Sequence, residues 1–183
     1  MASDSFTIQQ VTMPCDVTPE LRQALAECWI EVTNAGGAAG FPFPPVDAAT
    51  VMPALDGIID LLSPDTSRLL TATMADELVG WLNVRRDRFE LIAHWGTLHH
   101  VQTRPAVRGH GVGRGLVNEV RRIARDEMGL EQLHLAARGD EGLEDFYGRL
   151  GWKEIGRWPG ALRLAPGDDR DDRDEVLMVL APL

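Results

Sequence analysis

The sequence has 183 residues, which is enough for one domain with its own hydrophobic core. Hydrophobic residues make up 44% and charged residues 25%, as in globular proteins, and no apolar run approaches the roughly 20 residues that span a bilayer. The net charge of -10 disfavours binding to a nucleic-acid backbone. We therefore expect a single domain, 1–183, with no nucleic-acid and no membrane partner.

The N-terminus lacks the basic and apolar regions of a secretory signal, which predicts a cytoplasmic location. Cys15 and Cys28 are too few for a disulfide framework and have no metal-site spacing, so we expect reduced thiols and no metal. Basic residues, in contrast, gather in one part of this acidic chain, which indicates a local anion site. They are Arg104, Arg108, Arg114, Arg121, Arg122 and Arg125.

Periodicity and capping residues predict the first elements. Residues 7–13 alternate polar and apolar side chains, which indicates a strand. Thr18 can cap a helix that begins at Pro19, and Asp47 can cap a second helix that ends near Leu62. The glycine- and proline-rich segment 34–45 between these helices is too apolar for a plain linker, so we interpret it as a binding loop.

The second half of the chain continues with alternating strands and helices. The predicted elements are a hairpin of two strands (67–74 and 78–86), a long strand (92–103), a helix that ends at Gly129, a strand (132–137), a short helix (143–150) and two final strands (152–157 and 176–180). Gly96 would allow a β-bulge in the long strand. An acidic loop at 165–175 is expected to be mobile. This order predicts an α/β fold with a mixed sheet.

One glycine-rich loop lies between the long strand and an amphipathic helix, and it reads Arg108-Gly109-His110-Gly111-Val112-Gly113. Glycines let a backbone approach an anion closely, and a helix N-terminus supplies unpaired N–H groups with a partial positive charge. Arg104, Arg108 and Arg114 would add counter-charge. The alternative is a tight turn that binds no ligand.

Two familiar nucleotide motifs do not fit this loop. A Walker loop needs Gly-Lys-Ser/Thr, but Gly113 is followed by Arg114-Gly115. A Rossmann fingerprint needs a third glycine three residues after the second, where this chain has Arg114 or Leu116. What remains is the pattern Arg-x-x-Gly-x-Gly, with Pro105 ending the strand before it.

The segment 101–116 resembles the acetyl-CoA motif of the GNAT N-acetyltransferase superfamily. A second family element, Phe-Tyr-x-x-Leu-Gly-Phe, is similar to residues 146–152, where Trp152 takes the last position. The resemblance implies a GNAT-like single domain of the α/β class, with a mixed six- to seven-stranded sheet and helices on both faces. It also implies acetyl-CoA as co-substrate, bound by a strand, loop and helix at 92–128.

The resemblance carries residue roles with it. In the family, the strand backbone pairs with the pantetheine arm and the loop backbone binds the pyrophosphate. Tyr147 occupies the position of the family's tyrosine near the sulfur, so it would be the general acid; a core tyrosine is the alternative. The implied cofactor-binding residues are Val101, Gln102 and Thr103 for pantetheine, and Arg108, Gly109, His110, Gly111, Val112 and Gly113 for pyrophosphate.

The resemblance does not supply a base, because many family members have Glu where this chain has Thr97. By strand alternation, His99 shares a face with Thr97 and Val101, and the ordinary histidine pKa of about 6.5 suits a base. Neighbours on a strand point to opposite faces, which disfavours a metal pair of His99 with His100. The alternatives to His99 are His100, Asp140, Glu144 and removal of the proton by water.

The N-terminal part, 1–66, is expected to form the acceptor side, since 32–41 with Asp47 is similar to tabtoxin-resistance-like acetyltransferases. Phe41 and Trp95 would wall the pocket and Asp47 would meet a substrate ammonium, unless they serve packing and capping.

The leading prediction is direct transfer of an acetyl group from acetyl-CoA to a primary amine of a small molecule. The alternatives are an acetyltransferase for protein N-termini or lysines, and a non-catalytic acyl-CoA sensor. Homodimer formation is left open.

Overall fold

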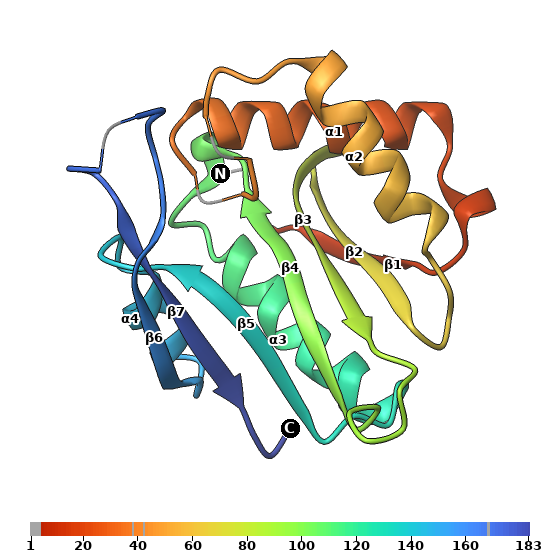
Figure 1. Ribbon diagram of the computed structural model, residues 1–183. Coiled ribbons are helices and arrows are strands. Elements are labelled where there is room, and N and C mark those ends of the chain that lie inside the picture. Colours follow the sequence, from red (N-terminus) through yellow and green to blue (C-terminus); the bar gives the residue numbers. More distant parts are fainter. Residues whose placement is uncertain (1–4, 38, 42, 168) are drawn as a thin grey trace.

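Seven strands form one mixed sheet in the order β1-β2-β3-β4-β5-β7-β6, with helices on both faces (Figure 1). The computed structural model describes residues 5–37, 39–41, 43–167 and 169–183. The strands are β1 (Thr7–Val11), β2 (Ser67–Met74), β3 (Glu77–Arg86), β4 (Trp95–Thr103), β5 (Gln132–Arg138), β6 (Lys153–Leu162) and β7 (Arg173–Leu180), and the helices are α1 (Pro19–Asn34), α2 (Ala48–Asp60), α3 (Val112–Asp126) and α4 (Leu143–Gly148). The predicted fold class is confirmed.

Both predicted helix caps are present. Thr18 Oγ1 accepts a hydrogen bond from the Leu21 N–H at 3.2 Å, and the Asp47 carboxylate accepts one from the Thr50 N–H at 3.0 Å. Such a cap satisfies one of the four N–H groups that the first turn of a helix leaves without partners.

Two glycines turn the chain at the end of α1. Gly36 has φ +83°, and the Gly37 N–H donates to Val32 O at 2.9 Å, which closes the helix with a left-handed cap. A Cβ at Gly37 would lie 2.6 Å from Val32 Cγ1, so only glycine fits there.

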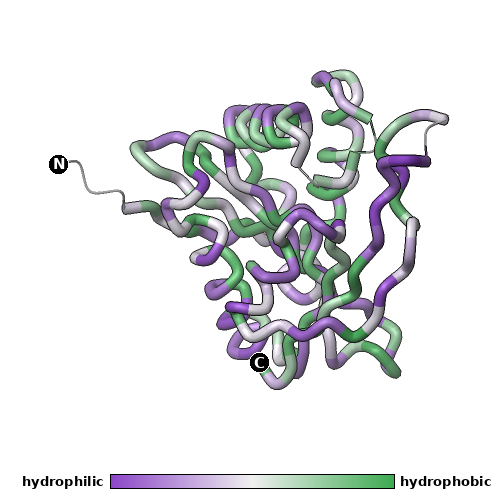
Figure 2. The backbone as a smooth tube through the Cα atoms, turned by 90° about the vertical axis from the view of Figure 1, so that its left-hand side faces the viewer, coloured by the Kyte–Doolittle hydropathy of each residue, from purple (hydrophilic) through white to green (hydrophobic). Residues whose placement is uncertain are grey.

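The sheet separates two hydrophobic clusters. α1 and α2 cover one face, where Trp29 and Trp81 are buried with ring centroids 5.3 Å apart. α3 covers the other face with an apolar stripe that includes Leu116 and Val120. Hydrophobic and hydrophilic residues alternate along the helical coils in Figure 2, as expected for helices that pack on one side only. Burial raises the pKa of Cys28, in the first cluster, to about 12, so it stays a thiol.

The hairpin between β2 and β3 has a two-residue turn. Ala75 and Asp76 have φ values of +48° and +65°, the signs that a type I′ turn needs at both central positions. The predicted hairpin is therefore confirmed, with β3 beginning one residue earlier than expected, at Glu77.

The sequence predicted a bulge at Gly96, but the bulge in β4 lies elsewhere. Asn83 pairs with His99 and Trp81 pairs with Gln102, so a single β3 residue faces both His100 and Val101. His100 has φ +55° there. Gly96 instead permits close packing, because a Cβ would lie 2.8 Å from Leu130 Cδ1.

β4 and β5 are paired only at their start. Their registered pairs end at Thr97 and His134, although the strands continue to Thr103 and Arg138. Figure 1 shows the two strands diverging toward their carboxyl ends. The backbone of β4 beyond Thr97 therefore faces a gap in the sheet on the β5 side.

The strands on either side of the acidic segment are longer than predicted. β6 and β7 pair as far as Leu162 and Arg173, so residues 163–172 connect them, and the mobility of the segment stays a prediction. Charged side chains of the segment pair with its flanks: Arg163 binds Asp172 at 2.8 Å, and the Gly160 N–H donates to Asp174 at 2.9 Å. Ala38 and Pro42 of the predicted binding loop and Asp168 of the acidic segment lie outside the described residues.

The helices among the described residues are all too short or too polar to cross a membrane.

Candidate active site

A cavity of about 570 Å³ fills the gap between β4 and β5. Its walls come from the end of α1, the carboxyl halves of β4 and β5, the glycine-rich loop with the start of α3, and α4. The lining residues are Gly36, Gly37, Leu98, His100, Val101, Gln102, Thr103, Val107, Arg108, Gly109, Gly111, Val112, Gly113, Arg114, Leu135, Ala136, Ala137, Arg138, Glu141, Leu143, Phe146 and Tyr147. Apart from His110, every residue predicted to bind the cofactor lines this cavity.

The glycine-rich loop presents backbone to the cavity. Gly109 and Gly111 have φ values of +86° and +84°, which side chains rarely tolerate, and Gly111 is the N-cap of α3. The first N–H groups of this 15-residue helix have no partner within the helix, so they are able to bind an anion. Arg108 and Arg114 line the same cavity and supply positive charge.

Arg104 does not line the cavity, so the prediction that it adds positive charge there with Arg108 and Arg114 is wrong. Its guanidinium forms an ion pair with Glu31 of α1 and donates from Nε to Leu78 O at 2.7 Å. Because its donors are engaged by α1 and β3, Arg104 fixes the helix against the sheet and lies outside the cavity wall.

Tyr147 of α4 is 6% exposed and contributes to the cavity wall. Its ring packs edge-on against Phe146 and Trp152, with centroids 5.0 Å and 5.7 Å away. Burial raises the pKa of its phenol, so the hydroxyl keeps its proton at neutral pH. Within the described residues the hydroxyl has no hydrogen-bond partner, which leaves it able to donate to a bound molecule.

The bulge rearranges the two histidines of β4. His99 pairs with Asn83, which pairs with Leu69, so His99 faces the α1 and α2 side. His100 turns to the same side, where its ring lies 4.6 Å from Trp29, and the two imidazole centroids are 6.0 Å apart. The assumption that these neighbours point to opposite faces is therefore wrong, because the extra residue interrupts the alternation.

The bulge also separates Val101 from His99. Val101 packs against the α3 cluster that contains Leu98, so it does not share the face of Thr97 and His99 as predicted.

The two histidines differ in access to the cavity. His100 contributes to its wall, whereas His99 does not. His100 Nδ1 lies 3.4 Å from Ala39 O, which as a carbonyl accepts, so Nε2 keeps its lone pair. Burial, with the positive charges of His100 and Arg85, lowers the pKa of His99 to about 4, well below the value assumed from the sequence. Burial also lowers the pKa of His100.

A second cavity, of about 250 Å³, adjoins the first. The two share Gly36, Gly37, Arg138 and Glu141 in their walls. The remaining lining residues of the second cavity are Thr33, Phe41, Pro44 and Leu164. The arrangement thus consists of a larger groove with an anion site at one end and a smaller pocket beside it.

Comparisons with known proteins give the family of this arrangement. The model of the acetyltransferase (GNAT) family matches residues 19–152. The chain belongs to this family. A search of curated proteins finds no match.

Three solved structures share the GNAT fold over nearly the whole chain. They are yncA from Salmonella typhimurium with its cofactor acetyl-CoA (16% identity, TM-score 0.71, 97% of this chain and 94% of that chain), an aminoglycoside 6'-N-acetyltransferase complexed with coenzyme A (15%, 0.69, 96% and 96%), and a ribosomal-protein-alanine N-acetyltransferase from Brucella melitensis (20%, 0.69, 96% and 99%). At these identities the similarity shows the fold.

The predicted acceptor residues of this GNAT domain lie in three different places. Phe41 lines the second cavity and packs on Trp29 with ring centroids 4.7 Å apart. Asp47 caps α2 and lies outside both cavity walls. Trp95 stacks on His134 at 4.4 Å, at the opposite end of β4 from the cavities. Of the three, only Phe41 is positioned to contact a ligand.

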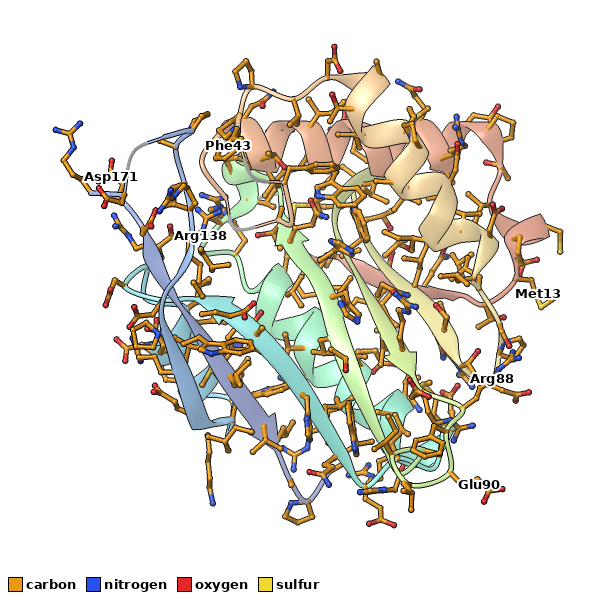
Figure 3. The ribbon with its side chains drawn as sticks, in the orientation of Figure 1. Met13, Phe43, Arg88, Glu90, Arg138 and Asp171 are labelled. Atoms are coloured by element: carbon orange, nitrogen blue, oxygen red, sulfur yellow. The ribbon has the colours of Figure 1, made fainter. Side chains whose placement is uncertain are left out.

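Sequence reasoning missed Arg138 and Glu141. Arg138 is the last residue of β5, and its Nη1 donates to Gly36 O at 3.3 Å and to Glu141 Oε1 at 3.1 Å. In Figure 3, Arg138 lies below Phe43 of the α1–α2 loop and beside the segment that carries Asp171. The available signal was its place at the carboxyl end of a parallel strand, where α/β proteins bind ligands.

The two acidic base candidates, Asp140 and Glu144, lie outside the walls of both cavities. The Glu144 carboxylate accepts from the Asp140 N–H at 3.2 Å and pairs with Arg157 at 3.3 Å. Among the described residues no group of three or more histidine, cysteine or acidic side chains is arranged to hold a metal ion.

Proposed function

We propose that this GNAT-family protein transfers an acetyl group from acetyl-CoA to the primary amine of a small molecule. The observation that carries the proposal is the 570 Å³ cavity, which combines an unpaired β4 edge, a helix N-terminus and Tyr147. Two proteins of the same fold that are bound to coenzyme A or acetyl-CoA support it.

The cavity has the features that an acyl-CoA molecule requires. The amide groups of an extended pantetheine arm need backbone partners, and the β4 backbone around Val101 and Thr103 faces the gap. A pyrophosphate needs convergent N–H donors and positive charge, which the loop from Arg108 to Gly113 and the side chain of Arg114 can provide. The smaller cavity lies beside this groove and would receive the acceptor.

The reaction is a direct acyl transfer. The amine nitrogen attacks the thioester carbonyl carbon, the new C–N bond forms, the C–S bond breaks, and sulfur leaves as a thiolate. Tyr147 donates its proton to this thiolate and regains one from water. His100, which is neutral at pH 7 and has a free Nε2, accepts the proton that the amine loses and passes it to solvent.

This assignment moves the base from His99 to the neighbouring His100. The reason is position, because His100 lines the cavity and His99 does not. The proposal that the acceptor is a small molecule is based on the volume of the second cavity. At about 250 Å³ this cavity is smaller than the roughly 300–1,000 Å³ of typical drug-sized ligand sites, so it would hold only a small acceptor. The likeness to tabtoxin-resistance-like enzymes and the cytoplasmic location stay predictions from the sequence.

Thermal unfolding with added nucleotides tests the co-substrate. Acetyl-CoA should raise the melting temperature, whereas NADH and ATP at equal concentration should not. A screen of primary amines that follows free CoA then tests the transfer. The proposal fails if acetyl-CoA gives no selective stabilisation. Stabilisation without release of CoA by any amine would favour the sensor over the enzyme.

A further inference from the structure

The second cavity carries one positive and one negative side chain. Among its described lining residues, Arg138 and Glu141 are the only charged ones. They form an ion pair at 3.1 Å, and their side chains are 14% and 31% exposed. Both also line the larger groove, so the pair lies where an acceptor amine would meet the acyl group.

The guanidinium of Arg138 is fixed in this position. The Gly36 carbonyl accepts from the same Nη1 that binds Glu141, which anchors Arg138 to the turn that ends α1. That turn depends on Gly37, where no Cβ would fit. The site is therefore held by the ends of α1 and β5, two rigid elements.

From this pair we infer that the acceptor is an α-amino acid with an apolar side chain; the inference rests on the proposed acetyl transfer. A zwitterion can place its ammonium beside Glu141 and its carboxylate beside Arg138, so that every charge stays paired. A simple amine would engage Glu141 and leave Arg138 unpaired, and a partly buried unpaired charge is costly. A guanidinium also binds a carboxylate through two parallel hydrogen bonds.

The rest of the pocket matches the remainder of such a molecule. Phe41, Pro44 and Leu164 present apolar surface, which suits an aliphatic or aromatic side chain. The ammonium must lose its proton before the nitrogen can attack, and His100 borders the groove that Glu141 shares. The charge pair thus orients the acceptor, while proton transfer is left to other groups.

Matched acceptors test the inference. Free CoA is measured with leucine and phenylalanine, with their decarboxylated amines, and with their amides. The amino acids should have the highest kcat/KM, and Arg138→Gln should lower this value about 10- to 100-fold for them while leaving the poor turnover of the amines unchanged. Arg138→Lys should restore part of the loss.

Arg125→Gln is the matched control, because Arg125 is exposed on α3 and pairs with Asp126, away from both cavities. It should change neither substrate preference nor the KM for acetyl-CoA. Equal or faster turnover of the decarboxylated amines or amides would overturn this inference and leave the proposed function in place. An unchanged amino-acid preference in Arg138→Gln would also overturn it. Absence of CoA release with every compound would instead refute the acetyl transfer on which it rests.

Discussion

The two cavities are built from different parts of the chain. The larger one presents backbone groups from three places: the part of the β4 edge that has no partner, glycines with positive φ, and the first turn of α3. The smaller one is formed mainly by side chains from α1, the α1–α2 loop, the segment after β5 and the β6–β7 connection.

This difference determines which residue types each cavity tolerates. A backbone site constrains local residue types, because it requires glycine where a Cβ would intrude and a strand and helix on either side. A side-chain site tolerates any set of residues that presents the right groups in space. The larger cavity should therefore control affinity for acetyl-CoA, and the smaller one the choice of acceptor.

The largest effect expected is on catalysis by Tyr147, whose side chain lines the larger cavity. Tyr147→Phe should lower kcat about 100- to 10,000-fold, the usual range for losing a general acid, and leave the KM for acetyl-CoA within about twofold. Steady-state kinetics with both substrates varied measures the two separately. Unchanged turnover in a folded variant would remove Tyr147 from the mechanism, and a large rise in KM instead would make it a binding residue.

The same contrast explains how much could be predicted from the sequence. The strand, loop and helix around Gly109 and Gly111 were predicted because each requirement falls on adjacent residues. The bulge at His100 was missed, since it arises from the register of β4 against Trp81 of β3, far away in the chain. That shift in register placed His99 and His100 on one face and changed the choice of base.

The smaller cavity was predicted only in part for a related reason. Phe41 was found from the unusual apolar loop that carries it. Arg138 and Glu141 were missed because an ion pair three residues apart has no distinctive sequence pattern. The position of Arg138 also depends on its hydrogen bond to the Gly36 carbonyl, 102 residues away in the chain. Asp47 and Trp95 have the right residue types, but one caps a helix and the other stacks at the far end of β4.

Filling the larger cavity should produce the second largest effect. Gly113 lines it near the start of α3, so Gly113→Leu should weaken acetyl-CoA binding about 100-fold, equivalent to about 2.7 kcal/mol. Gly57→Leu is the control, because Gly57 lies in α2 with open space around it. Calorimetric titration measures both affinities. If Gly113→Leu binds acetyl-CoA normally, the groove is not the co-substrate site.

The acid sensitivity of the protein should come from three histidines of β4 and β5. Burial lowers the folded-state pKa of His99, to about 4, and of His100 and His134. Well above pH 6.5 these rings are neutral in both states, so their contribution to stability is complete. As the pH falls from 6.5 toward 4, the unfolded chain binds protons that the folded chain does not, and the free energy of unfolding decreases.

This window differs from that of the carboxylates. The paired carboxylates have lowered pKa values, so their contribution is lost only below about pH 4.5. His99→Asn should therefore flatten the decrease between pH 6.5 and 4.5 in thermal unfolding. One titrating group can change the free energy of unfolding by at most about 1.4 kcal/mol per pH unit, and solvent screening of the half-buried His99 ring keeps its contribution below this limit. His110→Asn, at an exposed loop position, is the control, and an equal flattening there would contradict the assignment.

The smallest effect concerns Gln102, which lines the larger cavity although its side-chain amide atoms are buried. The residue is 4% exposed, and neither polar atom of its side-chain amide has a hydrogen-bond partner among the described residues. Gln102→Met keeps the length and removes both unsatisfied groups, so it should stabilise the fold by about 1–2 kcal/mol.

A gain of that size would raise the melting temperature by about 2–4 °C per kcal/mol in a chain of this length. Gln132→Met should give no such gain, because the Gln132 amide oxygen is already hydrogen-bonded to His134 at 3.1 Å. Acetyl-CoA affinity should be unchanged in Gln102→Met, since the co-substrate is expected to meet only the backbone at this position. A loss of affinity would mean that the larger cavity also binds through side chains, and the contrast between the two cavities would then rest on the glycine loop alone.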